Sequence, residues 1–210
     1  NLHIQINSLM KIRLFGQKFQ KLFKGKIIAK IKIATFFSKI KTQKEYKTME
    51  FDFRVTSGKV HLTDPCYDVD MSSKYGAYNV PARNGDWHVE VECIDHWGTR
   101  VKRWKAYHKD FRNSSGMIMD VRFGVDSGQF GIFDSENYIG DTDEDNRNWY
   151  LNICECHDVS GSVIPDGTGF ISSTGFGDGC YDGYAAYDED GNLIMFEIEF
   201  ISDDEEEDEY

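Results

Sequence analysis

Apolar and polar side chains alternate with a period of two through much of residues 50–201, and this period predicts short β-strands. The clearest case follows the turn at residues 188–192, where apolar side chains occupy every second position from Ile194 to Phe200. Glu197 and Glu199 lie between them. The pattern is typical of a strand with one buried face and one solvent-exposed face.

The same alternation predicts further strands, separated by turns rich in glycine, aspartate and asparagine. These strands are 51–55, 59–62, 87–93, 99–108, 117–123 and 129–133. Residues 149–158 fit helical as well as strand spacing, and we expect a short helix there, after an acidic loop at 141–148. Many short strands with little helix indicate an all-β fold with a minor helix, either an antiparallel β-sandwich or a partly open barrel.

Charge is distributed very unevenly along the 210 residues. Residues 1–48 carry eleven Lys, one Arg and one acidic residue, whereas the remainder carries 12 basic and 35 acidic residues. The net charges are +11 and −23, and segments so different rarely share one folded unit. We therefore expect a basic leader or arm at 1–48 that is not part of the domain, a β-rich domain at 49–201 and an acidic, disordered tail at 202–210.

Several interpretations of the basic segment stay open. It is an upstream leader with Met49 as the start of the protein, an organellar transit peptide, or a basic amphipathic helix over 15–40 that binds a membrane surface or nucleic acid. We favour the leader because a coherent acidic domain begins directly after Met49.

Residues 175–179 place glycine at three alternate positions. A phosphate-binding loop of this kind requires a following helix, but residues 180–184 are predicted to continue as a strand. We therefore expect a tight, strained turn in which glycine supplies positive φ angles. Asp178, flanked by two glycines, then caps neighbouring backbone N–H groups, which is the commoner outcome, or contacts a ligand.

Three segments match metal sites in part. Residues 186–197 and 141–146 fit some positions of an EF-hand loop, but the first has alanine at position 1 and the second has asparagine where glycine is invariant. Residues 154–157 contain Cys-x-Cys-His rather than the Cys-x-x-Cys pairs of zinc sites. We expect no metal and no cofactor, and five reduced cysteines.

The sequence contains neither the G-x-S-x-G motif of serine hydrolases nor the HExxH motif of zinc proteases, so no catalytic residue is assigned. Candidate ligand-binding residues are acidic, hydroxyl and aromatic side chains in or beside predicted turns. They are Asp64, Tyr67, Asp126, Ser127, Asp134, Asp178 and Tyr181. We expect the glycine-rich turn to present Asp178 beside the Asp64–Tyr67 turn and the Asp126 segment.

Three stretches carry a family resemblance. They are DPCY at 64–67, VDSGQ at 125–129 with GIFD at 131–134, and SSTGFGDG at 172–179 with Tyr181. In this order they resemble a family of uncharacterised bacterial and bacteriophage proteins defined as a domain of unknown function. The resemblance spans about Val60 to Ile201 and implies a bacterial or phage origin, but it implies no activity.

The leading functional hypothesis is a soluble, non-enzymatic binding or interaction protein, with an accessory bacteriophage role and an unknown protein or small-molecule partner. Its acidic surface argues against direct nucleic-acid binding by residues 49–201, because neutralising phosphates requires Lys and Arg. The alternative is a hydrolase or small-ligand-binding protein in which Asp64, Asp126, Asp134 and Asp178 converge at one end of the fold. No apolar run approaches transmembrane length, and we expect a cytoplasmic location, the bacterial host cytoplasm if the protein is phage-encoded.

Overall fold

The computed structural model describes residues 46–112, 118–138, 144–156 and 158–203. All of these belong to the unit Glu45–Tyr210. Outside the described residues lie 1–45 of the predicted basic leader, 204–210 of the acidic tail, residue 117 of the predicted strand 117–123, the EF-hand-like positions 141–143, and His157.

The described residues form eleven strands and two helices. The first six strands are β1 (Lys47–Val55), β2 (Lys59–Thr63), β3 (Ala77–Pro81), β4 (Gly85–Asp95), β5 (Thr99–His108) and β6 (Ile118–Val125). The other five are β7 (Gln129–Asp134), β8 (Ser162–Val163), β9 (Gly169–Ser173), β10 (Gly179–Tyr187) and β11 (Leu193–Glu199). The helices are α2 (Val69–Tyr75) and α3 (Glu144–Cys156).

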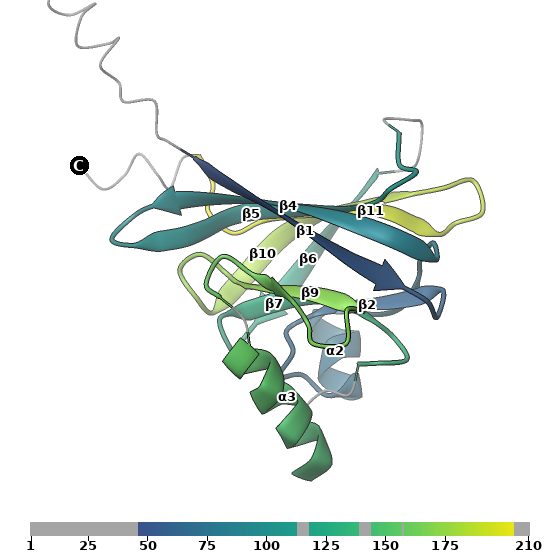
Figure 1. Ribbon diagram of the computed structural model, residues 1–210, viewed down its shortest axis with the longest axis horizontal. Helices are drawn as coiled ribbons and strands as arrows, with labels where there is room; N and C mark the ends of the chain where they lie inside the picture. Colours follow the sequence, from purple (N-terminus) through teal and green to yellow (C-terminus); the bar gives the residue numbers. More distant parts are fainter. Residues whose placement is uncertain (1–45, 113–117, 139–143, 157, 204–210) are drawn as a thin grey trace, which may run out of the picture. The chain divides into compact units, whose positions relative to one another are not determined.

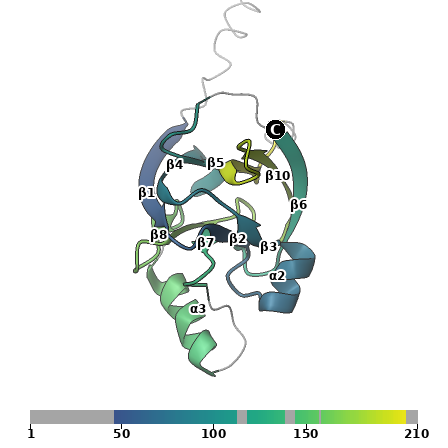
Figure 2. The same cartoon turned by 90° about the vertical axis from the view of Figure 1, so that its right-hand side faces the viewer.

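The strands form two antiparallel sheets. Sheet A has the order β1-β4-β5-β11-β10-β6, and sheet B has the order β3-β2-β7-β9-β8. The sheets face each other with the core between them, and the helices lie on the far side of sheet B (Figures 1 and 2). The predicted all-β sandwich with a minor helical component is therefore confirmed.

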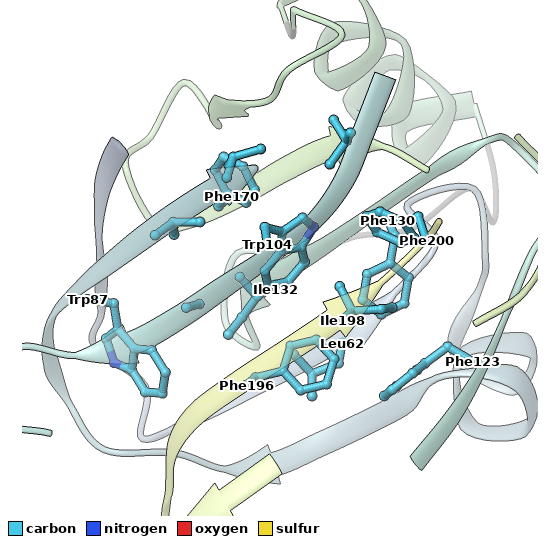
Figure 3. Close-up of a cluster of buried hydrophobic side chains, with 14 of the residues drawn as sticks. Leu62, Trp87, Trp104, Phe123, Phe130, Ile132, Phe170, Phe196, Ile198 and Phe200 are labelled. Carbon is cyan, nitrogen blue, oxygen red and sulfur yellow. The ribbon is translucent and has the colours of Figure 1, made fainter. Parts of the chain in front are cut away.

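The core consists of the alternating apolar positions that the sequence pattern predicts. In β4 the residues Trp87, Val89 and Val91 are fully buried, while His88 and Glu90 point to the outer face, where they pair with residues of β1 and β5. Aromatic rings fill the centre of the sandwich, and the cluster is drawn in Figure 3. Burial of these side chains is the main stabilising contribution.

Each helix packs against sheet B from outside. The α3 side chains Trp149 and Ile153 pack on Phe133 of β7 and Ile171 of β9. The helix begins at Glu144, so the second half of the predicted loop at 141–148 is helical. The other helix, α2, was not predicted; it is only seven residues long, and its N-cap Asp68 accepts a hydrogen bond from the Met71 N–H.

Strand β1 begins at Lys47, where it pairs with Cys93 of β4. The expected domain boundary after residue 48 therefore falls inside this strand. Within the part of the chain that the structure describes, no helix is both long and apolar enough to cross a membrane.

The turns lie at two ends of the sandwich. We call the end where β4 passes into β5 the motif end, because the turns of all three sequence motifs lie there. It comprises residues 64–68, 95–99, 126–128 and 174–178, and β1 begins there (left in Figure 1). The opposite end comprises residues 56–58, 82–84, 134–137 and 188–192.

Candidate binding site

The Asp64 carboxylate joins the first two motifs. It is fully buried and accepts hydrogen bonds from the Asp126 N–H at 2.9 Å and the Ser127 N–H at 2.7 Å. Its other oxygen accepts from the Ser127 hydroxyl at 2.6 Å and the Cys66 N–H at 2.8 Å. One carboxylate thus holds together the turn at 64–68 and the turn at 126–128. Asp64 and Asp126 are 62 residues apart in sequence.

The third motif joins this pair through Gly128. The Thr174 N–H donates to the Gly128 carbonyl at 3.0 Å, and the Gly177 Cα lies 3.5 Å from the position that a Cβ on Gly128 would occupy. Inside the glycine-rich turn, the Tyr181 hydroxyl lies 2.5 Å from the Gly177 carbonyl and 3.1 Å from the Thr174 carbonyl. The three motifs therefore meet at one end of the sandwich, and Tyr181 holds the shape of the turn.

Asp134 does not lie with the other candidates. It stands opposite Val60 in the β2–β7 ladder, whereas Thr63, next to Asp64, stands opposite Gly131. This register places Asp134 at the opposite end, where it is fully buried and accepts hydrogen bonds from the Thr56 and Ser57 N–H groups at 2.6 and 3.0 Å. The four carboxylates of the hydrolase hypothesis therefore do not all converge, because one of them caps the β1–β2 turn.

Asp134 should make stability dependent on pH. Burial alone raises its pKa, but backbone N–H donors at Thr56, Ser57 and Glu136 outweigh burial and lower it below the ordinary value. Because the folded pKa is the lower one, the stabilisation is present above the unfolded pKa of about 3.9 and is lost as the pH falls through the folded pKa. We expect Asp134→Asn to lower the free energy of unfolding by about 1–2 kcal/mol at pH 7.

Urea unfolding of both proteins at pH 7 and pH 3 measures this effect. The difference between wild type and Asp134→Asn should shrink at pH 3, while the exposed Glu189→Gln should match wild type at both pH values. A difference of equal size at both pH values would contradict the ionic role of Asp134.

The surroundings of the Cys66 thiol disfavour its thiolate form. Burial, followed by the nearby Asp64 carboxylate, raises its pKa far above the ordinary value. The thiolate is the reactive form of cysteine, so a raised pKa makes the Cys66 thiol less reactive. Tyr67 is also buried, and burial together with a hydrogen bond to Asp126 raises the pKa of its phenol. In both side chains the raised pKa favours the neutral form.

The tip of the β4–β5 hairpin adds an exposed aromatic residue to the motif end. Trp97 is 89% exposed and has a φ of +53°, followed by Gly98 at +110°. A bulky residue with positive φ is a backbone outlier, and such outliers gather at functional sites. The Trp97 ring stacks on His96 at a centroid distance of 5.9 Å and an interplanar angle of 16°.

The hairpin tip contacts the glycine-rich turn. Phe176, 53% exposed, meets the His96 ring edge-to-face at 5.6 Å. The Arg100 guanidinium lies 5.8 Å from the Phe176 ring centroid and donates to the Gly175 carbonyl at 3.2 Å. We call Trp97, His96, Phe176 and Arg100 the aromatic platform. Sequence reasoning did not single out Trp97 or Arg100, although Trp97 in a His-Trp-Gly turn between two strands was a visible signal.

Two carboxylates near the aromatic platform remain exposed. Asp178 is exposed to solvent, and among the described residues its side chain has no hydrogen-bond partner. The expected capping role for Asp178 is therefore not observed. Asp126 is also exposed but is bonded to the Tyr67 hydroxyl. Asp178 Oδ1 lies 3.8 Å from the Cβ position of Gly128, which is two residues after Asp126, so the two carboxylates belong to turns that meet at this glycine.

The glycine-rich turn should be strained only where φ is positive. Gly175 and Gly177 have φ values of +58° and +111°, whereas Gly179 has no positive φ. A Cβ on Gly177 would meet no atom within 4 Å, so Gly177→Ala tests backbone strain without a steric clash. We expect it to lower the free energy of unfolding by about 1–3 kcal/mol in urea melts. A neutral result would contradict the strained turn.

The outer face of sheet A carries a second concentration of charge, but its charges are paired. Arg103 contacts Glu92 at 2.8 Å, and the Tyr107 hydroxyl donates to Glu90 at 2.7 Å. Lys105 lies 4.0 Å from Glu197. These contacts follow the cross-strand register and account for the surface as a solvated sheet face. In the described residues, no group of three or more His, Cys, Asp or Glu side chains is arranged to hold a metal ion.

The four cysteines whose side chains are described, Cys66, Cys93, Cys154 and Cys180, are free thiols. Cys154, one of the zinc candidates, lies with its sulfur 3.3 Å from Gln129 Oε1 and so connects α3 to the start of β7. Comparison of the chain with protein-family models, with curated proteins and with solved structures finds no match in any of the three.

Proposed function

We propose that the protein is a non-enzymatic binding protein that holds its partner at the motif end. One observation carries this proposal: Trp97 is 89% exposed at a positive φ, beside the half-exposed Phe176. Exposed Trp and Arg side chains are the residue types that dominate binding energy at protein interfaces. Strained backbone costs free energy of folding, and exposed large rings are typical of interaction sites. Binding of a partner to the two rings would offset that cost.

The hydrogen bonds of the buried carboxylates support a framework role for the motif residues rather than a reaction. Both oxygens of Asp64 are occupied by hydrogen bonds from the turn at 126–127 and from Cys66. Asp134 is occupied in the same way at the other end. The motif residues thus build the end of the sandwich on which the aromatic platform rests.

A ligand panel tests the proposal. Thermal shift with nucleotides, divalent metals, glycans and basic peptides is compared for wild type, the double variant Trp97→Ala/Phe176→Ala and a control double variant Tyr184→Ala/Leu151→Ala. The control removes exposed apolar area on the outer face of sheet A and on α3. We expect a ligand that stabilises wild type and the control to lose its effect on the platform variant. A ligand response that survives loss of both rings would contradict the proposal.

The alternative function is a hydrolase or small-ligand site at Asp126 and Asp178. It is favoured by a single observation: the exposed carboxylates of Asp126 and Asp178 lie in two turns that meet at Gly128. Turnover of p-nitrophenyl phosphate or acetate that disappears in Asp126→Asn and Asp178→Asn, and persists in Trp97→Ala, would establish this alternative instead.

The proposal also covers the biological origin of the protein and its cellular compartment. The resemblance of the three motifs to bacterial and bacteriophage proteins supports an accessory bacteriophage role. The free thiols support a reducing compartment, which is the cytoplasm of the bacterial host. The net charge of −23 on residues 49–210 supports a partner other than nucleic acid.

A further inference from the structure

The aromatic platform presents an open ring face in a negatively charged surrounding. The Trp97 ring stacks on His96 on one side only and is 89% exposed. Asp95 is exposed in the same hairpin, and one of its carboxylate oxygens accepts the Gly98 N–H at 3.3 Å. Asp178 is exposed in the neighbouring turn and has no hydrogen-bond partner among the described residues.

The cation of the platform is already engaged. Arg100 donates to the carbonyl groups of Gly175 and His96 and lies over the Phe176 ring. It therefore fastens the two turns to each other, while the exposed carboxylates leave the surrounding surface negative. A phosphate or another anionic ligand would meet these carboxylates and gain no unengaged cation in exchange.

We propose that the ligand of the platform is a positively charged segment of a partner protein, with an Arg or Lys side chain placed over the Trp97 ring. This inference rests on the proposed binding function and specifies its partner. Tryptophan is the aromatic side chain that binds cations best through its ring face. Asp95 and Asp178 supply charge complementarity around that ring, and the net charge of −12 on the chain favours the approach of a basic partner.

Nuclear magnetic resonance of the indole N–H groups tests this assignment on the full chain. The probes are N-acetyl-arginine amide and N-acetyl-citrulline amide, which have nearly the same shape but differ in charge. We expect the arginine probe to shift the Trp97 indole signal and to bind about three- to fivefold more tightly than the citrulline probe. The signals of the buried Trp87 and Trp104 should not move, and they also report that each variant is folded.

Variants separate the ring from the charges. Trp97→Ala should abolish the response at Arg100 and Phe176 backbone signals, Trp97→Phe should retain part of it, and Asp178→Asn should weaken it about twofold. Glu189→Gln, at the opposite end of the sandwich, is the charge-matched control and should leave it unchanged. Raising the salt concentration from 20 to 500 mM should weaken binding of the arginine probe only.

The two levels of the proposal fail differently. Equal binding of the arginine and citrulline probes, or a stronger Trp97 shift with adenosine monophosphate, methyl β-glucoside or phosphatidylcholine vesicles, would overturn the cationic partner but leave binding at the motif end intact. If none of these probes moves the Trp97, Arg100 or Phe176 signals, both the cationic partner and the binding role of the platform are wrong.

Discussion

Replacing Asp64 with alanine is expected to lower the free energy of unfolding by about 3–5 kcal/mol, enough to unfold a marginally stable domain. The carboxylate is fully buried and accepts four hydrogen bonds, three of them from backbone N–H groups at Cys66, Asp126 and Ser127. Alanine would remove the acceptor of three partly buried donors and leave a cavity, and a donor that stays shielded from water without a partner costs about 1–3 kcal/mol.

Urea unfolding of Asp64→Ala measures this loss, and Asp178→Ala is the matched control. Both residues are aspartates in motif turns at the same end, but Asp178 is exposed and has no hydrogen-bond partner among the described residues. Asp178→Ala should stay within about 0.5 kcal/mol of wild type. Similar losses in the two variants would show that burial and hydrogen bonding do not distinguish the two carboxylates.

Most of the strands could be predicted because each sheet has one buried face. The segment 99–108 coincides with β5, and the apolar positions of the last strand, including Phe196 and Ile198, are buried as expected. A period of two in the sequence maps directly onto the two faces of a strand. The alternation was therefore sufficient to predict these strands, because it alone decides which face of each strand is buried.

The helices were harder to predict because tertiary contacts decide them. The first half of α3 contains acidic and amide residues that are typical of loops, and it is Trp149 and Ile153 that anchor the helix on sheet B. The seven-residue α2 is held by the Asp68 cap and by contacts with β2 and β3 that a local pattern does not show. Short helices are marginal without such contacts.

The role of each aspartate could not be predicted from its turn. Asp64, Asp134 and Asp178 all occupy turn-like sequences, yet the first two are buried caps and the third is free in solvent. The difference depends on which distant backbone approaches each carboxylate, and Thr56 is 78 residues from Asp134. The contact between Trp97 and Phe176 through His96 is equally non-local.

The second substitution with a large expected effect on the free energy of unfolding is Trp104→Ala, in the core. The Trp104 ring is 1% exposed and lies 5.4 Å from Phe196 and 5.6 Å from Phe170 (Figure 3). Trp104→Ala should lower the free energy of unfolding by about 3–5 kcal/mol, because it removes buried apolar surface and leaves a cavity between two sheets. Chemical denaturation followed by far-ultraviolet circular dichroism measures this change.

Substitution with phenylalanine separates volume from hydrogen bonding at two buried tryptophans. The Trp104 indole N–H is buried without a hydrogen-bond partner among the described residues, whereas the Trp87 indole N–H donates to the Arg83 carbonyl at 3.0 Å. Both substitutions remove the same volume, but only Trp87→Phe breaks a bond, while Trp104→Phe removes a donor that is already unsatisfied. Trp87→Phe should therefore be the more destabilising by about 1–3 kcal/mol. If Trp104→Phe lowers the free energy of unfolding by as much as Trp87→Phe or more, this prediction is wrong. The indole N–H of Trp104 would then have a hydrogen-bond partner in solution.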